Sequence, residues 1–134
     1  MYAYLYEQAR KINRRHRHVT AIVYKHHYTI GQNSLNTGRC GKHSNFSVHS
    51  EVQCISNYLK ETLKSKNGKK VRIDINNAYC YYKLPKIILI NVRVLKNGSI
   101  AESKPCEDCM SLIKKYNVKE LHYFNGKEIV IKKF

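Results

Sequence analysis

The sequence predicts an α/β domain in which helices and strands alternate along the chain. Three observations support this fold class. Apolar residues recur at helical spacing in three segments, runs of β-branched and apolar residues of strand length lie between and after them, and an Asn-Gly pair joins the last two runs. The resulting order is helix, strand, strand, helix, strand, helix, strand, strand. No repeat, low-complexity segment or composition change divides the 134 residues, so we expect a single domain over 1–134.

The first three elements are a helix over 2–12 and strands over 19–24 and 28–30. The helix is indicated by five apolar residues at helical spacing: Tyr2, Leu5, Tyr6, Ala9 and Ile12. The strands are indicated by β-branched and apolar residues on either side of a short polar connection. Adjacent strand residues point to opposite faces, so we treat His26 and His27 as surface residues rather than as joint metal ligands.

A long polar segment over 31–48 precedes a second helix, predicted over 49–64. Loops of this length in a compact domain usually carry function. This one ends at His49, so we expect it to form one wall of a pocket. An apolar stripe indicates the helix: Val52, Ile55, Leu59 and Leu63. Residues 66–85 give no clear pattern, and their tyrosines are compatible with stacking on bases or with an insertion that covers the sheet.

The next strand, over 86–95, begins with a nearly continuous apolar run, which is typical of a central strand buried on both faces. A third helix is predicted over 105–117, with Pro105 at its first position, where proline is favoured. Its inward face is expected to contain five residues: Cys106, Cys109, Met110, Ile113 and Asn117.

The last two strands, over 119–124 and 128–134, flank Asn125-Gly126, which is a strong hairpin signal. A parallel pairing would need a crossover of about a dozen residues, and the chain has no room for one here. The sequence therefore predicts an antiparallel hairpin formed by the last two strands.

Basic residues outnumber acidic ones by 25 to 9, which gives a formal net charge of +16. Such an excess suits a polyanionic partner, because lysine and arginine that neutralise phosphates release counterions. The alternative source is an AT-rich genome, which enriches lysine but does not readily explain the small number of acids. The densest basic run, over 10–18, is compatible with a phosphate contact or with a solvated loop.

No secretory signal and no apolar run of membrane-spanning length is visible, so we expect no membrane partner. The five cysteines, an odd number, are then expected to be reduced thiols, metal ligands or both. A cytoplasmic location is expected, or the host cytoplasm or nucleus if the protein is viral.

Cys106 and Cys109 lie three residues apart at a predicted helix start, so both thiols fall on one face. A helix N-terminus favours the thiolate, which is the form that binds zinc. His49, at the start of the neighbouring helix, can supply a nitrogen. Three protein ligands leave the fourth tetrahedral position for water, which is the catalytic arrangement, and zinc lowers the pKa of such a water.

Glu51 lies two residues beyond His49 and can reach a metal-bound water from the mouth of the helix. A carboxylate there can take a proton from water and pass it to a ring nitrogen and then to a leaving amine. The backbone amide of Ser50 would lie near the developing charge, and the carbonyl of Ser103 could accept a hydrogen bond from the departing amine.

Three alternatives to a catalytic zinc site remain open. A structural zinc site would need a fourth ligand, for which the candidates are Cys40, His43, Cys54 and Cys80. A redox pair would prefer a thioredoxin-like context, which this sequence lacks. The third alternative is a chance placement of these residues.

His49-Ser50-Glu51 together with Pro105-Cys106-x-x-Cys109 resembles the signature of the cytidine deaminase-like superfamily, which includes cytidine, deoxycytidylate and tRNA adenosine deaminases and nucleic-acid editors. The resemblance covers almost the whole chain and implies a three-layer α/β/α sandwich with a mixed five-stranded sheet. It implies that His49, Cys106 and Cys109 bind zinc and that Glu51 is the proton shuttle. Residues 92–106 resemble small deaminases of viral and phage type. Members of this superfamily often form dimers or tetramers, so the chain is compatible with a homo-oligomer.

The resemblance also suggests substrate contacts. Gly31-x-Asn33 resembles the glycine-x-asparagine at the end of the second strand in this superfamily, so Asn33 is the first candidate for a sugar or base contact, and Asn36 is the second. Leu35 stands where deaminases of free cytidine carry a glutamate. The other expected contacts are Ser50, Ser103 and three aromatic residues that could hold an unstacked base: Phe46, Tyr123 and Phe124.

The resemblance implies hydrolytic deamination of cytosine to uracil, and the charge favours single-stranded DNA or RNA as the substrate. The alternative substrates are free cytidine, deoxycytidine or deoxycytidylate, because the predicted terminal hairpin resembles the free-nucleoside branch. Below these we place adenine deamination and a non-catalytic, zinc-stabilised module that binds nucleic acid.

Overall fold

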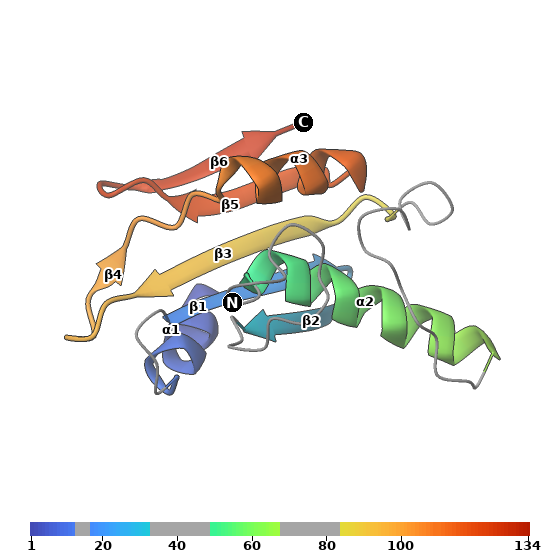
Figure 1. The fold of residues 1–134 in the computed structure, drawn as a ribbon, viewed down its shortest axis with the longest axis horizontal. Helices are drawn as coiled ribbons and strands as arrows, with labels where there is room; N and C mark the ends of the chain where they lie inside the picture. Colours follow the sequence, from blue (N-terminus) through green and yellow to red (C-terminus); the bar gives the residue numbers. More distant parts are fainter. Residues whose placement is uncertain (13–16, 33–48, 68–83) are drawn as a thin grey trace.

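The computed structural model describes residues 1–12, 17–32, 49–67 and 84–134, which form three helices and six strands (Figure 1). In chain order the elements are α1 (Tyr2–Arg10), β1 (Arg17–Tyr24), β2 (His27–Gln32), α2 (Ser50–Asn67), β3 (Ile88–Val94), β4 (Ile100–Ala101), α3 (Glu107–Lys115), β5 (Glu120–Phe124) and β6 (Ile129–Lys133).

All six strands belong to one mixed sheet with the order β2-β1-β3-β5-β6, and β4 extends it by pairing with the end of β3. The pairs β1–β2, β1–β3 and β5–β6 are antiparallel, and the pair β3–β5 is parallel. The predicted α/β class and the mixed sheet are confirmed. The expected number of five strands is one too small, because β4 has only two residues and leaves no run to recognise.

β3 is the central strand, between β1 and β5, as its apolar run predicts. Its alternate residues enter two separate clusters of buried side chains, with Ile90 and Val92 on one face and Leu89 on the other. Asn91, only 3% exposed, interrupts this apolar run on the Leu89 face. The core of the protein therefore lies on both sides of β3.

α1 packs on one face of the sheet, and α2 and α3 pack on the other (Figure 1). α1 buries Leu5 and Ala9 in the cluster that contains Ile90 and Val92. On the other face, Ile55 of α2 and Ile113 of α3 join Leu121 of β5. This arrangement carries the N-termini of α2 and α3 to the same face of the sheet.

α3 begins two residues later than predicted, at Glu107, with Cys106 as its extended N-cap residue and Pro105 outside the helix. Two members of the predicted inward face are wrong, because Cys106 and Asn117 are exposed. With the later start, the residues at helical spacing that face the core are Cys109, Leu112, Ile113 and Tyr116. Asn117 instead adopts a positive φ of 63° beyond the helix end, where asparagine is tolerated.

β5 and β6 form the antiparallel hairpin that Asn125-Gly126 predicts. The Asn125 side-chain oxygen accepts hydrogen bonds from the backbone N–H groups of Lys127 and Glu128, each at 2.8 Å. Gly126 has a φ of +99°, which a residue with a side chain rarely adopts. The turn chemistry therefore fixes where β5 ends and β6 begins.

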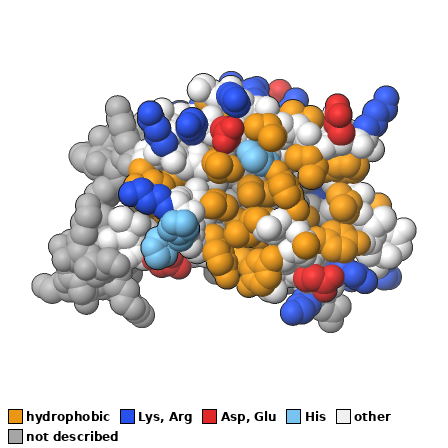
Figure 2. Space-filling model, turned by 180° about the vertical axis from the view of Figure 1, so that it is seen from behind, with side chains coloured by type: hydrophobic (Ala, Val, Ile, Leu, Met, Phe, Trp, Pro, Cys, Tyr) orange, Lys and Arg blue, Asp and Glu red, His pale blue; other side chains and the backbone are white. Residues whose placement is uncertain are grey.

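The α1 side of β5 and β6 leaves apolar side chains in solvent, and hydrophobic residues gather over the centre of this side in Figure 2. Ile129 and Ile131 are each about half exposed, at 49% and 53%. Among the described helices, none combines the length and the apolar character that a membrane crossing requires.

Candidate metal centre

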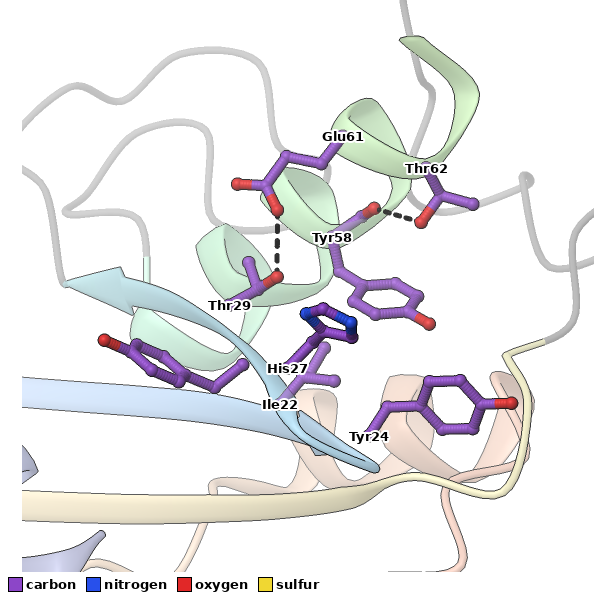
Figure 3. A pocket seen from close by; sticks show the side chains of 8 residues that line it. Ile22, Tyr24, His27, Thr29, Tyr58, Glu61 and Thr62 are labelled. Atoms are coloured by element: carbon purple, nitrogen blue, oxygen red, sulfur yellow. Dashed lines mark hydrogen bonds between the residues drawn. The ribbon is translucent and has the colours of Figure 1, made fainter. Parts of the chain in front are cut away.

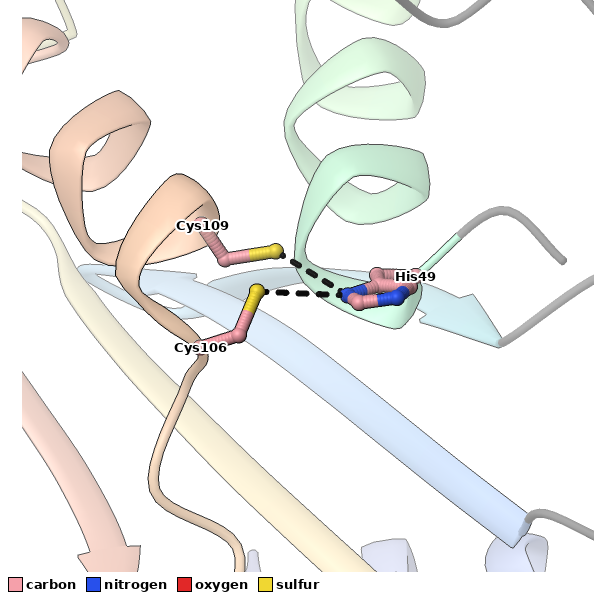
Figure 4. A group of neighbouring side chains, drawn as sticks. All are labelled: His49, Cys106 and Cys109. Atoms are coloured by element: carbon pink, nitrogen blue, oxygen red, sulfur yellow. Dashed lines mark hydrogen bonds between the residues drawn. The ribbon is translucent and has the colours of Figure 1, made fainter. Parts of the chain in front are cut away.

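His49 and Cys106 occupy equivalent places at the starts of two helices. The His49 carbonyl accepts the first hydrogen bond of α2, from Gln53 N at 3.0 Å, and the Cys106 carbonyl accepts the first bond of α3, from Met110 N at 2.8 Å. Each residue therefore caps its helix, and the two helix starts face each other (Figure 4). The positive ends of two helix dipoles converge there, which favours thiolate over thiol.

The side chains of His49, Cys106 and Cys109 meet between these helix starts (Figure 4). His49 Nδ1 lies 3.3 Å from Cys109 Sγ and 3.6 Å from Cys106 Sγ, and the three donor atoms all lie within 4.8 Å of one another. Ordinary Zn–S and Zn–N bond lengths in a tetrahedron would separate N from S by about 3.6 Å. Two thiols and an imidazole also form a donor set that zinc prefers. This group could therefore hold a metal ion, and its dimensions fit zinc.

The three donors differ in their exposure. Cys109 is fully buried, His49 is half-buried and Cys106 is exposed, so the group opens to solvent on the Cys106 side. Burial raises the pKa of the Cys109 thiol, and the charge and the hydrogen bond of Glu51 raise it further. A bound cation would instead lower the pKa of this thiol, because it stabilises the thiolate.

The Glu51 carboxyl lies beside this group, and it is only 3% exposed. Its Oε1 accepts a hydrogen bond from the Ser50 hydroxyl at 3.0 Å. A buried acid next to three metal-ligating side chains is costly unless it has such partners. The structure therefore brings together the four residues that the sequence motif singled out: His49, Glu51, Cys106 and Cys109.

A chain of buried polar groups connects Glu51 to Ser103 across the sheet. Ser50 Oγ lies 2.7 Å from Thr20 Oγ1, and the Thr20 hydroxyl donates to Asn91 Oδ1 at 2.6 Å. Asn91 Nδ2 in turn donates to the Ser103 carbonyl at 2.7 Å. Sequence reasoning missed Thr20 and Asn91 as parts of the site. The available signal was a polar residue inside each strand that was otherwise apolar, because buried polar groups need partners.

Ser103 is fixed at both its backbone and its side chain. Its hydroxyl donates to the Asn91 carbonyl at 2.9 Å and accepts from the backbone N–H of Phe124, also at 2.9 Å. Its own N–H donates to the Phe124 carbonyl at 2.9 Å. Ser103, three residues before Cys106, is thereby tied to both β3 and β5.

Tyr123 and Phe124 point to opposite faces of the sheet, although both were expected at the mouth of the site. Tyr123 packs against the cluster that contains Cys109. Phe124 pairs with Ile129 and lines a hollow of about 140 Å³ together with Tyr6 of α1, and Tyr123 also borders this hollow. Period-two alternation along β5 separates the two rings, so Tyr123 shares the face of the metal group and Phe124 does not.

Cys54 is not part of the metal group. It lies on α2, donates to the Thr29 carbonyl at 3.3 Å, and is fully buried, which raises the pKa of its thiol. Its neighbour Gly31 explains the glycine of the Gly31-x-Asn33 pattern, because a Cβ at Gly31 would lie 2.3 Å from Cys54 N. Other predictions fall outside the described residues: the contacts Asn33, Asn36 and Phe46, the alternative ligands Cys40, His43 and Cys80, positions 13–16 of the basic run, the pocket wall expected over 33–48 and the tyrosines within 68–83.

A separate hollow of about 470 Å³ lies at the other end of α2, where aromatic side chains from β1, β2 and α2 surround it (Figure 3). Its residues include Tyr24, Tyr58 and Glu61, and Thr29 donates to Glu61 Oε2 at 3.0 Å. Glu61 lies ten residues after Glu51, about 15 Å further along the helix. His27 lines this hollow and is exposed, which agrees with its expected place at the surface.

No family model, curated protein or solved structure matches this chain. The geometry of His49, Cys106, Cys109 and Glu51 is therefore the main guide to function.

Proposed function

We propose that this protein is a zinc-dependent hydrolytic deaminase that converts cytosine to uracil, and that it adopts the three-layer sandwich of the cytidine deaminase-like superfamily. One observation carries the proposal: a buried carboxyl, Glu51, lies beside a His-Cys-Cys group that could hold a metal ion. A purely structural metal site has no need of such a carboxyl.

A zinc ion held by His49, Cys106 and Cys109 would supply Lewis acidity and lower the pKa of a water in the remaining coordination position. Glu51 would act as the proton carrier: it would accept a proton from the attacking water, deliver it to the ring nitrogen of the base, and pass the second proton of that water to the departing amine. The Ser103 carbonyl, held by Asn91, accepts a hydrogen bond from the leaving amine. Ser50 orients Glu51 through the hydrogen bond to Oε1.

The proposed substrate is cytosine in single-stranded DNA or RNA. The net charge of +16 supports a polyanionic substrate. A base in a strand must leave its stack to reach this group, and Tyr123 is the aromatic residue on the correct face to receive it.

Free cytidine or deoxycytidylate is the second candidate substrate. The observation in its favour is the antiparallel pairing of β5 with β6, which resembles the free-nucleoside branch of the superfamily. In this case the basic surface would attract a nucleotide phosphate or would have no part in the reaction.

A substrate panel tests the proposal directly. Zinc-loaded protein is incubated with single-stranded and double-stranded oligonucleotides, cytidine, deoxycytidine monophosphate and adenosine, and uracil or inosine products are measured. We expect uracil from the single strand and at least about 100-fold less from Glu51→Gln, since general acid–base catalysis contributes on this scale. Glu61→Gln, on the same helix, is the matched control and should retain activity.

The panel also separates the alternatives. Conversion of cytidine with no change in any oligonucleotide would reject the nucleic-acid substrate. An absence of product from every substrate, in protein that contains one zinc ion per chain, would reject the deaminase.

A further inference from the structure

A third hollow, of about 360 Å³, lies between α3 and β6 and reaches the residues directly before Cys106. Lys104 and Pro105, which directly precede Cys106, form one end of it. From there it follows α3 past Glu107 and Met110 to Lys114. The eight residues from Glu107 to Lys114 are separated by seven steps, which correspond to about 10 Å along the helix. The hollow is therefore an elongated extension of the metal-ligand loop.

The charge of this hollow is positive. Lys104, Lys114 and Lys132 contribute three ammonium groups from three different elements, and Glu107 contributes one carboxylate. Among the residues that the structure describes, none of these three lysines forms an ion pair with an acid. All three are exposed to solvent, and the Lys132 ammonium also lies over the Phe134 ring, 5.6 Å from its centroid.

The hollow also has apolar surface. The Pro105 ring is buried in the chain, and the Met110 side chain is half-buried and packs against the core cluster of α3. Lysine stems are apolar too, with the charge only at the tip. A hollow with apolar surface at its base and ammonium groups around its edge suits a nucleotide. The apolar surface can contact the sugar and base, and the ammonium groups can bind the phosphate.

We propose that this hollow binds the phosphates of the single strand whose cytosine occupies the metal centre, an inference that rests on the proposed function. Lysine acts as a point charge toward phosphate and requires no fixed geometry, which suits a strand of any sequence. Lys104 and Pro105 of this hollow are the two residues before Cys106, so a strand with one base at the metal group would bring neighbouring phosphates toward it. Lysines from three segments of the hollow, before α3, on α3 and on β6, match more than one phosphate better than the single phosphate of a free nucleotide.

The test uses the Glu51→Gln protein with zinc bound, so that binding is measured without turnover. A fluorescent single-stranded oligonucleotide with one central cytosine is titrated in several salt concentrations. The pair Lys114→Gln/Lys132→Gln should weaken binding about fivefold and reduce the salt slope by about 1.4, because each phosphate contact of a single strand contributes about 0.7. The matched pair Lys60→Gln/Lys86→Gln removes the same charge elsewhere and should change binding less than twofold.

Glu107→Gln should change the affinity for the oligonucleotide in the opposite direction. It removes the acid of the hollow and should tighten oligonucleotide binding about twofold to threefold at low salt. Circular dichroism and thermal melting of each variant establish that the fold is retained.

Two results would overturn the assignment. In one, the two lysine pairs weaken oligonucleotide binding equally, so that only total charge matters. In the other, the Lys114 and Lys132 pair loses affinity for deoxycytidine monophosphate while the oligonucleotide binds as before, which makes the hollow a site for a free nucleotide. Turnover by the wild-type protein is measured separately. If binding depends on the hollow as expected but no base is deaminated, the hollow is supported and the proposed chemistry fails.

Discussion

Asn91 and Ser103 bind each other twice, through the Asn91 amide to the Ser103 carbonyl at 2.7 Å and through the Ser103 hydroxyl to the Asn91 carbonyl at 2.9 Å. Asn91 lies on the central strand, and Ser103 precedes the cysteine pair. The two bonds therefore hold the metal-ligand loop against the middle of the sheet.

Asn91→Leu should destabilise the protein by about 2–4 kcal/mol, because it leaves the Ser103 carbonyl and the Thr20 hydroxyl buried without these partners. Urea unfolding measures the change. Asn97→Leu, in the exposed turn after β3, is the control and should cost less than about 1 kcal/mol. Equal costs for the two variants would show that the buried network adds no stability.

Metal binding should stabilise the folded chain and should require Cys109. A zinc ion at 1,000 times its Kd contributes about 4 kcal/mol, so a chelator should lower Tm by roughly 10–20 °C. Cys109→Ser should lower the affinity for zinc at least about tenfold, as measured by metal analysis and competition with a chromophoric chelator. Cys54→Ala is the control, because Cys54 lies outside the group, and it should keep its zinc. Loss of zinc from both variants alike would contradict this assignment of the ligands.

Gly31→Ala should cost about 3 kcal/mol or more, because its Cβ would lie 2.3 Å from the backbone nitrogen of Cys54 and force β2 away from α2. Gly126→Ala is a matched control. Its Cβ would meet nothing within 4 Å, so only the positive φ of 99° is penalised, at about 1 kcal/mol. Chemical denaturation of the two variants compares these costs. A similar loss of stability in both variants would mean that α2 and β2 can move apart to accommodate the added methyl group without a large energetic cost.

The zinc-loaded protein should lose stability above about pH 8.5, in part through Cys54. Burial raises the pKa of this thiol, so the unfolded chain releases its proton at a pH where the folded chain still holds it. The stabilising contribution is complete below the unfolded pKa and declines by about 1.4 kcal/mol per pH unit above it. Urea unfolding between pH 7.5 and pH 9.5 measures the slope, and Cys54→Ala should flatten it by this amount. An unchanged slope in that variant would refute the assignment to Cys54.

The two neighbouring aromatic residues of β5 should differ in their effect on the proposed reaction. Tyr123→Leu should lower kcat/KM on a single-stranded oligonucleotide about tenfold, because base stacking contributes about 1–3 kcal/mol. Phe124→Leu should cause a smaller loss, since Phe124 lies on the α1 side. The reverse order would place the strand on the opposite face of the sheet.

The elements with a strong local pattern could be predicted from the sequence. The apolar run of β3 indicated its central place, and Asn125-Gly126 indicated the hairpin, because turn chemistry and period-two burial act over a few residues. β4 was not predicted, because a strand of two residues shows no alternation of apolar and polar positions. The start of α3 was placed at Pro105 from its preference for first helical positions, but the chain stays extended until Cys106.

The candidate site was predictable in part, because some of its residues form local sequence motifs. Cys106 and Cys109 form a local motif, and His49 and Glu51 form another. The contribution of Thr20 and Asn91 depends on which strands lie side by side, and nothing local in the sequence reports that pairing. Period-two alternation alone separates Tyr123 from Phe124, but which of the two rings shares the face of the metal group depends on the place of β5 in the sheet.

The capping of two helices by His49 and Cys106, 57 positions apart, has a consequence for the order of folding. The helix starts can meet only after β1, β3 and β5 have paired, and long-range parallel pairing is slow to form. In the unfolded chain His49 lies 57 positions from Cys106, whereas the finished sheet brings His49, Cys106 and Cys109 together. If this group binds a metal ion, binding by all three donors requires the completed sheet, and a chain with a misfolded sheet would bind the ion more weakly.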